Sequence, residues 1–489
     1  MEYETIIGLE THAQLLTESK MWCRCNADYA SAPPNTHVCP VCLGLPGVLP
    51  TMNRQAVEFT IMTALALKCT PASYTKFDRK NYPYPDLMKG YQISQYDNPV
   101  GKGGYLEIEV DGNRKTIGIT RVHLEEDVAK LVHCAPAFES PYSLVDVNRS
   151  GVPLMEVVSE PDMRSPEEAR QYLMKLRTIL QYLGVSTANM EEGSFRCDAN
   201  ISIRPVGTKE FGPKVEVKNM NSFKAVFRAL EYEAKRQRQA VSTGERITQE
   251  TRGWNDVRGE TFPQRSKEYA NDYRYFPEPD LPPLTISSTQ VSEIKGKLPE
   301  LPEARLIRYM RDYQLSLYDA SLITASKVQA DYYEEALKTE TGQKLPADKR
   351  AKDVANWLLG EAARIINEAN ADIEDFREKV SPENLCGLIA ASRSTINNLT
   401  AKIVLEEMYR SGKSADTIIK ERGLGQIGGA ELDEILSQVV VSNAQAVADY
   451  KAGKETAVKF LVGQVMRATK GQADPKLATE LLVKKLKES

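Results

Sequence analysis

The sequence has few histidines and tryptophans and no long apolar run. Of its 489 residues, four are histidine and three are tryptophan. No apolar run reaches the roughly 18 residues that a membrane span needs, and residues 1–4 lack the basic start and apolar stretch of a signal peptide. We therefore expect a cytoplasmic protein without a membrane span, whose eight cysteines bind metal or lie buried as reduced thiols.

Several common catalytic motifs are missing too. Residues 207–214 have the two glycines of a phosphate-binding Walker A loop, but Pro213 stands where the lysine should be. The chain has no G-x-S-x-G nucleophile elbow, no H-E-x-x-H zinc motif and no Ser/Lys-rich amidase signature. These absences argue against a P-loop nucleotide site and against a self-contained glutaminase.

The net charge of −4 argues against a uniformly basic nucleic-acid binder, but the charge is unevenly distributed. Residues 451–489 contain nine Lys/Arg and four Asp/Glu, a net charge of +5, so the rest of the chain carries −9. A basic end on an acidic body suits a protein that contacts a phosphate backbone through one module. The alternative is a solvated helix face.

The composition, 42% hydrophobic and 27% charged, fits a soluble globular protein, and the length predicts two or three domains. The pattern is mixed α/β up to about residue 290 and helical from about residue 295. Four prolines at 277–283 indicate the first boundary, and Gly412 the second. We predict an α+β protein with a mixed α/β domain at 1–292, an all-helical domain at 293–410 and a small helical tail domain at 411–489.

Local signals predict individual elements. Asp111-Gly112-Asn113 indicates a hairpin turn between strands at 104–110 and 115–120. Ser165 as an N-cap before Pro166 predicts a helix that ends near Gly184. Further strands are expected at 144–147, 154–158, 199–203 and 215–217, and further helices at 222–239, 354–366 and 457–468.

The clearest metal signal is two close pairs of cysteines: Cys23, Cys25, Cys39 and Cys42. Four thiolates can converge on one tetrahedral ion and leave no open position, so the pattern predicts a structural rather than a catalytic zinc site. The first pair is more closely spaced than usual, and His37 is an alternative ligand. The competing interpretation is buried thiols without metal, which is also what we expect of the isolated Cys69, Cys134, Cys197 and Cys386.

Ionisable residues also occur on predicted strands. Glu10, His12 and Gln14 would share one face of a strand at 8–15. Glu156 lies between apolar strand residues, where a charge is costly unless it is paired or bound to a metal. Carboxylates gathered on a sheet, including those at 125–127, suit Mg²⁺-nucleotide chemistry. The alternative for residues 125–127 is a solvated turn.

Residues 77–95 form a segment rich in Tyr, Lys, Arg and Asn and interrupted by Pro and Gly. Such a loop can offer cations to phosphate and aromatic rings to a base or a tRNA end. The alternative is a plain exposed loop.

These segments resemble the successive signature blocks of the B subunit of bacterial aspartyl/glutamyl-tRNA amidotransferases. The similarity runs in order from residue 5 to the end of the chain. One departure is Leu87-Met88-Lys89, where many relatives carry Asn-Pro-Lys. The matching blocks are Gly8-Leu9-Glu10 with His12, residues 77–95, 123–127, 144–149, 159–162, 195–200, 272–280 and 460–466.

The resemblance implies a fold and a reaction. The fold is an N-terminal cradle related to glutamine synthetase, then a helical domain, then a tail domain that contacts tRNA. ATP would phosphorylate the side-chain carboxylate of Glu on tRNA(Gln) or of Asp on tRNA(Asn), and ammonia would displace the phosphate. The partners would be an A subunit that hydrolyses glutamine to supply ammonia, and a small C subunit, in a heterotrimer.

The resemblance also implies roles for individual residues. Mg²⁺, or Mn²⁺, would be bound by His12, Glu126 and Glu156, with Glu10 and Glu125 as close alternatives. Catalytic roles are implied for Glu10, Lys80, Lys89 and Glu125, and ATP contacts for Arg79, Asn81, Tyr84, Gln92 and Ser94. Two other interpretations are a stand-alone ligase for a free amino acid, which would need no basic tail, and a non-catalytic tRNA-binding protein, which would need no acidic cluster.

Overall fold

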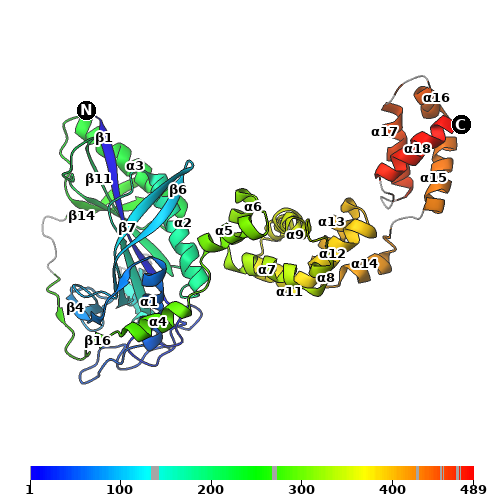
Figure 1. The fold of residues 1–489 in the computed structure, drawn as a ribbon. Coiled ribbons are helices and arrows are strands. Elements are labelled where there is room, and N and C mark those ends of the chain that lie inside the picture. The colour runs from blue at the N-terminus through cyan, green and yellow to red at the C-terminus, as the bar shows by residue number, and fades with distance from the viewer. Residues whose placement is uncertain are drawn as a thin grey trace. The chain divides into compact units, whose positions relative to one another are not determined.

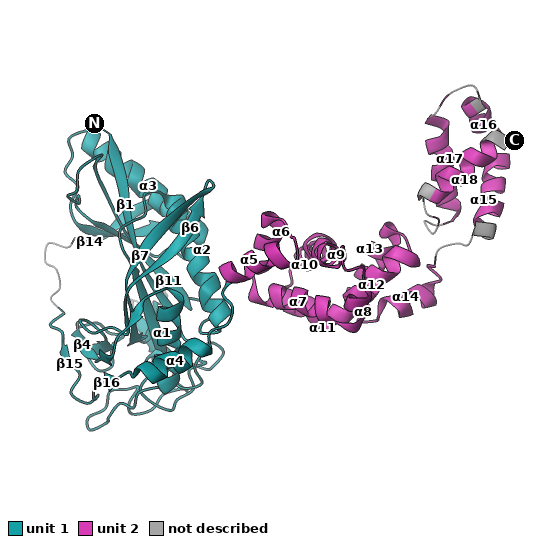
Figure 2. Ribbon diagram, viewed as in Figure 1, with its two compact units in different colours: residues 1–301 teal, residues 302–489 magenta. Residues whose placement is uncertain are grey.

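The computed structural model describes residues 2–133, 142–266, 273–425, 429–451, 454, 456–469, 473 and 475–488. The chain forms two compact units, residues 1–301 and 302–489, which are coloured separately in Figure 2. The first unit is built on a large β-sheet and the second is helical, so the predicted α+β class is confirmed. Among the described helices, none is both long enough and apolar enough to cross a membrane.

A nine-stranded sheet forms the centre of the first unit (Figure 1), with the strand order β14-β13-β12-β11-β1-β10-β7-β6-β2. Adjacent strands are antiparallel except β12 and β13, which are parallel. The strands are β1 (Tyr3–Gln14), β2 (Thr70–Pro71), β6 (Gly101–Val110), β7 (Asn113–Glu126), β10 (Pro153–Ser159), β11 (Phe195–Pro205), β12 (Val215–Lys218), β13 (Glu250–Asn255) and β14 (Glu260–Ser266).

Two local predictions are confirmed by the backbone at the ends of the elements. Asp111 and Gly112 join β6 to β7 with φ values of 51° and 76°, the left-handed conformation that a two-residue turn between right-twisted strands requires. The Ser165 side chain accepts a backbone hydrogen bond at the start of α2 (Pro166–Leu183), and Gly184, with a φ of 67°, ends this helix.

Helices cover the apolar face of the sheet. α3 (Phe223–Ser242) lies against β11, and α2 lies against both α3 and β6 (Figure 1). Leu173 and Leu176 of α2 and Leu230 of α3 are fully buried in one core with apolar strand residues. Each CH₂ group buried in such a core stabilises the fold by about 0.8 kcal/mol. The other face of the central strands carries polar side chains, and the candidate site lies there.

Smaller elements complete the first unit. β15 (Phe276–Pro277), β4 (Asp78–Asn81) and β5 (Tyr91–Ser94) form a three-stranded sheet, and two strand pairs join β3 (Tyr74–Thr75) to β16 (Leu284–Thr285) and β8 (Lys130–His133) to β9 (Ser143–Asp146). The remaining elements are α1 (Arg54–Ala66), the 3₁₀ turn η1 (Val147–Arg149) and α4 (Ser288–Gly296). Residues 15–53 between β1 and α1 form an irregular loop, with one isolated bridge between Ser19 and Asn26.

The first unit extends past the expected boundary at residue 292. α4 spans that position, and its Ile294 packs with Ile61, Val100 and Ile286. The proline-rich segment 277–283 is no linker, because β15 within it pairs with β4. The compact unit therefore ends near residue 301.

The described part of the second unit is helical. It contains α5 (Pro302–Asp312), α6 (Leu317–Thr324), α7 (Lys327–Lys338), α8 (Glu340–Lys344), α9 (Arg350–Trp357), the π-helical turn η2 (Leu358–Ala362), α10 (Ala363–Ala369), α11 (Ile373–Lys379), α12 (Pro382–Ser394), α13 (Asn398–Ser411), α14 (Ala415–Arg422), α15 (Gly429–Ser442), α16 (Ala444–Lys451), α17 (Thr456–Ala468) and α18 (Pro475–Glu488).

Two separate apolar cores occur in the second unit. One gathers residues between 309 and 419, and the other gathers residues between 432 and 486. We expected the tail to begin at residue 411, and Gly412 does end α13 with a φ of 70°. However, Ala415 and Ile418 of α14 pack into the first of these cores. The helical core therefore includes α14, and the core of the tail begins after it.

Candidate active site

The polar face of the sheet carries a row of ionisable side chains across four neighbouring strands. Arg196 on β11, His12 on β1, Glu156 on β10 and His123 on β7 stand opposite one another in the strand register. Paired residues in an antiparallel sheet point to the same face and lie about 5 Å apart, so the register itself gathers these groups. The next row points the other way, into the apolar core, and consists of Ala13, Met155 and Leu124.

Three of the side chains on this face could bind one cation. Nε2 of His12 lies 3.4 Å from Oε2 of Glu156 and 3.6 Å from Oε1 of Glu125. The ligand atoms of these three residues all lie within 4.8 Å of one another. Nε2 of His123 is also near, 3.1 Å from Oε2 of Glu156 and 3.8 Å from Oε2 of Glu125.

Opposite charges keep this cluster ionised although it is buried. Burial lowers the pKa of His123, but the negative charge of Glu156 and the hydrogen bond with Glu125 outweigh burial and raise it to about 9. Burial raises the pKa of Glu156, but the charges of His123 and His12 hold it well below its ordinary value. The cluster is therefore a balanced set of positive and negative groups. A divalent cation would replace the protons of the imidazoles.

Glu126, which we expected to ligate the metal, points to the other side of β7. Successive residues of a strand alternate between faces, so Glu125 and Glu126 cannot both join the cluster. The Glu126 carboxylate forms an ion pair with Lys89 and accepts a hydrogen bond of 3.0 Å from the N–H of Ile93. The carboxylate that faces the histidines is Glu125. Both are 3% exposed, so the segment is no solvated turn.

β5 supports the acidic pair from below. Ser94 donates a hydrogen bond of 2.9 Å to the Glu125 carboxylate, and Gln92 donates one of 2.7 Å to the backbone oxygen of Glu126. We expected Gln92 and Ser94 to contact ATP. Their partners in the structure are instead the residues that they position.

Two other residues expected to contact ATP are also held by protein groups. Arg79 donates two hydrogen bonds of 2.7 Å to the carboxylate of Glu278. Asn81 donates one of 2.9 Å to the carbonyl oxygen of Arg274. Tyr84 differs from them, because its side chain is 55% exposed.

Lys80 lies among tyrosines beside the acidic cluster. Its Nζ is 4.9 Å from the ring centroid of Tyr273 and 5.8 Å from that of Tyr82. Burial lowers the pKa of Lys80, but the charge of Glu125 and the neighbouring phenols outweigh burial and raise it. The ammonium therefore stays protonated. A positive charge fixed here can offset negative charge on a phosphate or a carboxylate.

Glu10 lies on the same face as His12, at the wall of a cavity of about 260 Å³. Asn200 donates a hydrogen bond of 2.9 Å to Oε1 of Glu10. The register partner of Glu10 on β11, Asp198, forms an ion pair with Lys218. The cavity combines polar groups with an apolar wall, which includes Leu9, Val158 and Phe211.

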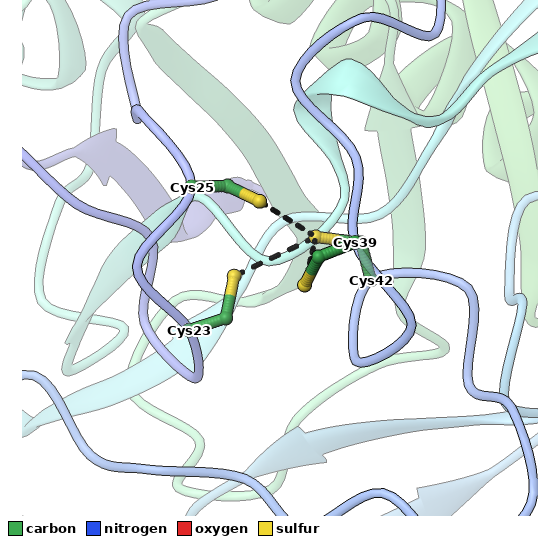
Figure 3. Close-up of side chains that lie close together, drawn as sticks. All are labelled: Cys23, Cys25, Cys39 and Cys42. Carbon is green, nitrogen blue, oxygen red and sulfur yellow. Dashed lines mark hydrogen bonds between the residues drawn. The ribbon is translucent and has the colours of Figure 1, made fainter.

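The four cysteines converge in the irregular loop between β1 and α1 (Figure 3). From Sγ of Cys42, the other sulfurs lie at 3.6 Å (Cys23), 3.7 Å (Cys39) and 3.9 Å (Cys25). Four sulfurs around a tetrahedral zinc, each about 2.3 Å from the ion, would be about 3.8 Å apart. The convergence predicted from the sequence is confirmed, and the spacing fits one tetrahedral ion.

The surroundings of the loop favour a thiolate at Cys42. The hydrogen bond from Cys23 lowers the pKa of Cys42 to about 4, against the effect of burial and with help from the Lys20 ammonium. His37, the alternative ligand, takes part through its backbone, since its N–H donates a hydrogen bond of 2.8 Å to the Asn148 side chain. The cysteines expected in the core, Cys69, Cys197 and Cys386, are buried, and Cys134 lies outside the described residues.

Three residues of the site were missed in the sequence. His123 stands two positions before Glu125, and this spacing could have shown that both face the same way. Asp127 accepts hydrogen bonds of 2.7 Å from Gln14 and from Arg196. These partners come from different strands, so only the strand register brings them together.

Known families match most of the chain. The family described as the GatB/GatE catalytic domain matches residues 5–292, and the family described as the GatB domain matches residues 332–486. Three similar proteins are all named as the B subunit of aspartyl/glutamyl-tRNA(Asn/Gln) amidotransferase. The protein of Dehalococcoides mccartyi is 63% identical over 100% of this chain and 99% of the relative. Those of Carboxydothermus hydrogenoformans and Thermomicrobium roseum are 54% and 53% identical, over 99% and 100% of this chain and 99% of each relative.

Proposed function

Because this chain belongs to the GatB family of tRNA-dependent amidotransferase subunits, we propose that it activates a carboxylate on misacylated tRNA. ATP phosphorylates the side-chain carboxylate of Glu attached to tRNA(Gln), or of Asp attached to tRNA(Asn). Ammonia then displaces the phosphate and forms the amide. The first step is needed because a free carboxylate would have to expel oxide, whereas phosphate is a good leaving group.

The observation that carries this proposal is the row of His12, Glu156 and His123 with Glu125 beside it. These side chains come from three adjacent strands and are positioned by the backbone hydrogen bonds of the sheet. Such groups are preorganised before a substrate arrives. Phosphoryl transfer to a carboxylate brings several negative charges together, and positive charges in fixed positions, such as Lys80, reduce the repulsion.

The donor set on this face fits a hard divalent cation. Two carboxylates and one imidazole suit Mg²⁺ or Mn²⁺. The separations of 3.4 and 3.6 Å are close to the roughly 3 Å between neighbouring ligands of a six-coordinate Mg²⁺. When bound, such an ion stabilises the negative charge of the phosphates. We therefore propose His12, Glu125 and Glu156 as its ligands, in place of the set with Glu126.

Other residues of the first unit have supporting roles in this proposal. Lys80 orients and neutralises the reacting carboxylate or phosphate. Lys89 acts through Glu126, on the junction of β5 and β7. The cavity beside Glu10 is the candidate position for ATP, because residues of the same sheet face line it. Tyr84, which is exposed, is the residue of segment 77–95 best placed to meet a base.

We propose that the cysteine loop binds one structural zinc ion. The sulfur separations fit a tetrahedral site, and four thiolates would leave no position for a substrate. The ion would therefore hold the loop rather than take part in the reaction. Chelator-washed and zinc-repleted protein should contain about one zinc per chain, and a far smaller content would contradict this assignment.

The proposed partners follow from the name of the relatives and from a missing motif. The relatives are named as one lettered component of an amidotransferase, which indicates an enzyme of several subunits. Since this sequence has no amidase signature, the ammonia should come from glutamine hydrolysed by an A subunit. A small C subunit would complete the heterotrimer.

We propose that the helical tail contacts the tRNA. The net charge of +5 at residues 451–489 suits a phosphate backbone, and the tail has a core of its own. Deletion of residues 426–489 from the complex should weaken tRNA binding and reduce its salt dependence. Unchanged affinity and unchanged salt dependence would contradict a role of the tail in tRNA binding.

The direct test of the whole proposal is an amidation assay. The complex of this chain with its A and C subunits is supplied with misacylated tRNA, ATP and glutamine. We expect amide to form only when ATP and misacylated tRNA are both present, and comparison of Glu-tRNA(Gln) with Asp-tRNA(Asn) identifies the substrate. If neither tRNA is amidated by a complex that still hydrolyses glutamine, the proposal is wrong.

A further inference from the structure

Lys20 is a fully buried lysine beside the cysteine loop. Its side chain is 0% exposed. Its Nζ donates hydrogen bonds to the carbonyl oxygen of His37 at 2.8 Å, to that of Val147 at 3.4 Å and to Sγ of Cys42 at 3.5 Å. Among the described residues, no carboxylate forms an ion pair with this ammonium. A buried charge without an opposite charge is costly.

The charge that meets Lys20 is on the sulfurs. Two of its three partners are neutral carbonyl groups, which can solvate an ammonium but cannot neutralise it. The third is Cys42, the sulfur at the centre of the cysteine group. Four thiolates around one divalent ion carry a net charge of −2, so a bound metal would leave excess negative charge next to the ammonium. Hydrogen bonds to ligand atoms from outside the coordination shell orient the ligands and strengthen metal binding.

We propose that Lys20 is the buried counter-charge of the metal–thiolate centre and raises the affinity of the cysteine loop for its metal. This inference rests on the zinc proposed above. It assigns Lys20 the role of a positioning residue, which acts on the metal through Cys42 and is not a ligand itself.

The same lysine ties the loop to the end of β7. Val147, which accepts from Lys20, belongs to η1, and a Cβ added at Gly151 would lie 3.6 Å from Cδ of Lys20. The carbonyl oxygen of Gly151 accepts from the N–H of Met21 at 2.6 Å, and its own N–H donates to the carbonyl oxygen of Asp127 at 2.9 Å. Loss of the metal should therefore be felt at the strand end that carries the acidic residues.

Zinc affinity measured by competition with a chromophoric chelator tests this role. The variants are Lys20→Met, which keeps the length of the side chain and removes its charge, and Lys235→Met, which removes an exposed lysine of α3. Both are prepared as full chains in the assembled complex. We expect zinc binding at least about tenfold weaker in Lys20→Met and unchanged in Lys235→Met.

Thermal unfolding separates this role from a merely structural one. In the zinc-loaded form, Lys20→Met should unfold at a lower temperature than the wild type. In the metal-free form, where the thiols can be protonated, it should unfold at the same or a higher temperature, because an uncompensated buried charge has been removed. Equal destabilisation of both forms with unchanged zinc affinity would show that Lys20 only links carbonyl groups, and would overturn the proposal.

A measurement on the wild type covers the case in which Lys20→Met does not fold. An amine-reactive reagent followed by mass spectrometry should leave Lys20 unmodified in the zinc-loaded protein and modify it after zinc removal. If Lys20 stays protected without zinc, the metal centre does not hold it and the inference fails. A wild type that binds no zinc at all would instead refute the zinc assignment on which the inference rests.

Discussion

The first unit contains two groups of metal-binding side chains that are positioned in different ways. His12, Glu125 and Glu156 lie on regular strands of the central sheet, whose backbone hydrogen bonds determine which side chains stand opposite one another. The four cysteines lie in the irregular loop between β1 and α1. The sheet group should therefore keep its shape without a metal, whereas the cysteine loop should depend on its metal for order. The first suits chemistry and the second suits structure.

The largest expected effect comes from removing a charge from the sheet group. Glu156→Gln keeps the shape of the side chain, so the fold should survive. We expect amide formation and tRNA-dependent ATP cleavage to fall about a hundredfold or more, since a lost metal ligand costs about 3 kcal/mol in the transition state. Glu125→Gln should behave in the same way. Basal glutamine hydrolysis in the same complex serves as the control for assembly.

Two outcomes would break this side of the comparison. Near wild-type amidation by Glu156→Gln would mean that the carboxylate does not ligate a catalytic metal. An equal fall in basal glutamine hydrolysis would mean that the substitution damages assembly of the complex, and the comparison would then need the unfolding temperature of the variant.

A smaller effect is expected from loss of the metal in the cysteine loop. Cys25→Ser should release zinc, make residues 21–50 sensitive to protease and lower amidation by about tenfold or less, because the loop acts through its contacts rather than on the substrate. Cys69→Ala, a change at a buried cysteine outside the loop, is the control and should retain zinc. A loop that stays protease-resistant after zinc loss would refute the idea that it depends on its metal.

Glu126→Gln tests which carboxylate belongs to the sheet group. Glu126 pairs with Lys89 on the other side of β7, and glutamine can still accept the hydrogen bond from Ile93. Loss of the ion pair should cost about 1 kcal/mol, roughly a fivefold reduction in amidation. If amidation by Glu126→Gln falls as far as that by Glu125→Gln, the ligand set inferred from the sequence is correct and the one inferred from the structure is not.

Features encoded by a few neighbouring residues could be predicted from the sequence. The turn at Asp111 and Gly112, the helix that begins after Ser165, and the shared face of Glu10 and His12 all depend on local conformation and alternation. The cysteine group was predictable because only its spacing mattered. The motif resemblance supplied the function, which no local pattern contained.

The features that could not be predicted depend on which strands are neighbours. His12 meets Glu156, which lies 144 positions later in the chain, because β1 pairs with β10 in one particular register. The choice between Glu125 and Glu126 is a matter of one residue along β7, and a shift of one residue moves a side chain to the opposite face. The end of the helical core was also missed, since a glycine helix cap at Gly412 does not tell whether the next helix packs back on the same core.

The smallest effect concerns a buried carboxylate that should have no part in the chemistry. Glu334 in α7 accepts hydrogen bonds from Arg305 at 2.8 Å, from Arg308 at 2.5 Å and from Tyr309 at 3.0 Å. Burial raises the pKa of Glu334, but the hydrogen bond from Arg308 and the charge of Arg305 outweigh burial and lower it from 4.5 to about 2. A carboxylate with a lowered pKa stabilises the fold fully above its unfolded value of 4.5, and this contribution is lost as the pH falls towards 2. Glu334→Gln should therefore lower the free energy of unfolding by about 2 kcal/mol at pH 7 and leave amidation by the folded complex unchanged. The difference between the variant and the wild type should shrink as the pH falls below about 4.5. Glu340→Gln, which breaks an exposed pair with Lys344, should change stability by less than about 0.5 kcal/mol. Denaturant unfolding at several pH values measures all three, and a stability difference for Glu334→Gln that does not change with pH would show that its charge is not what stabilises this unit.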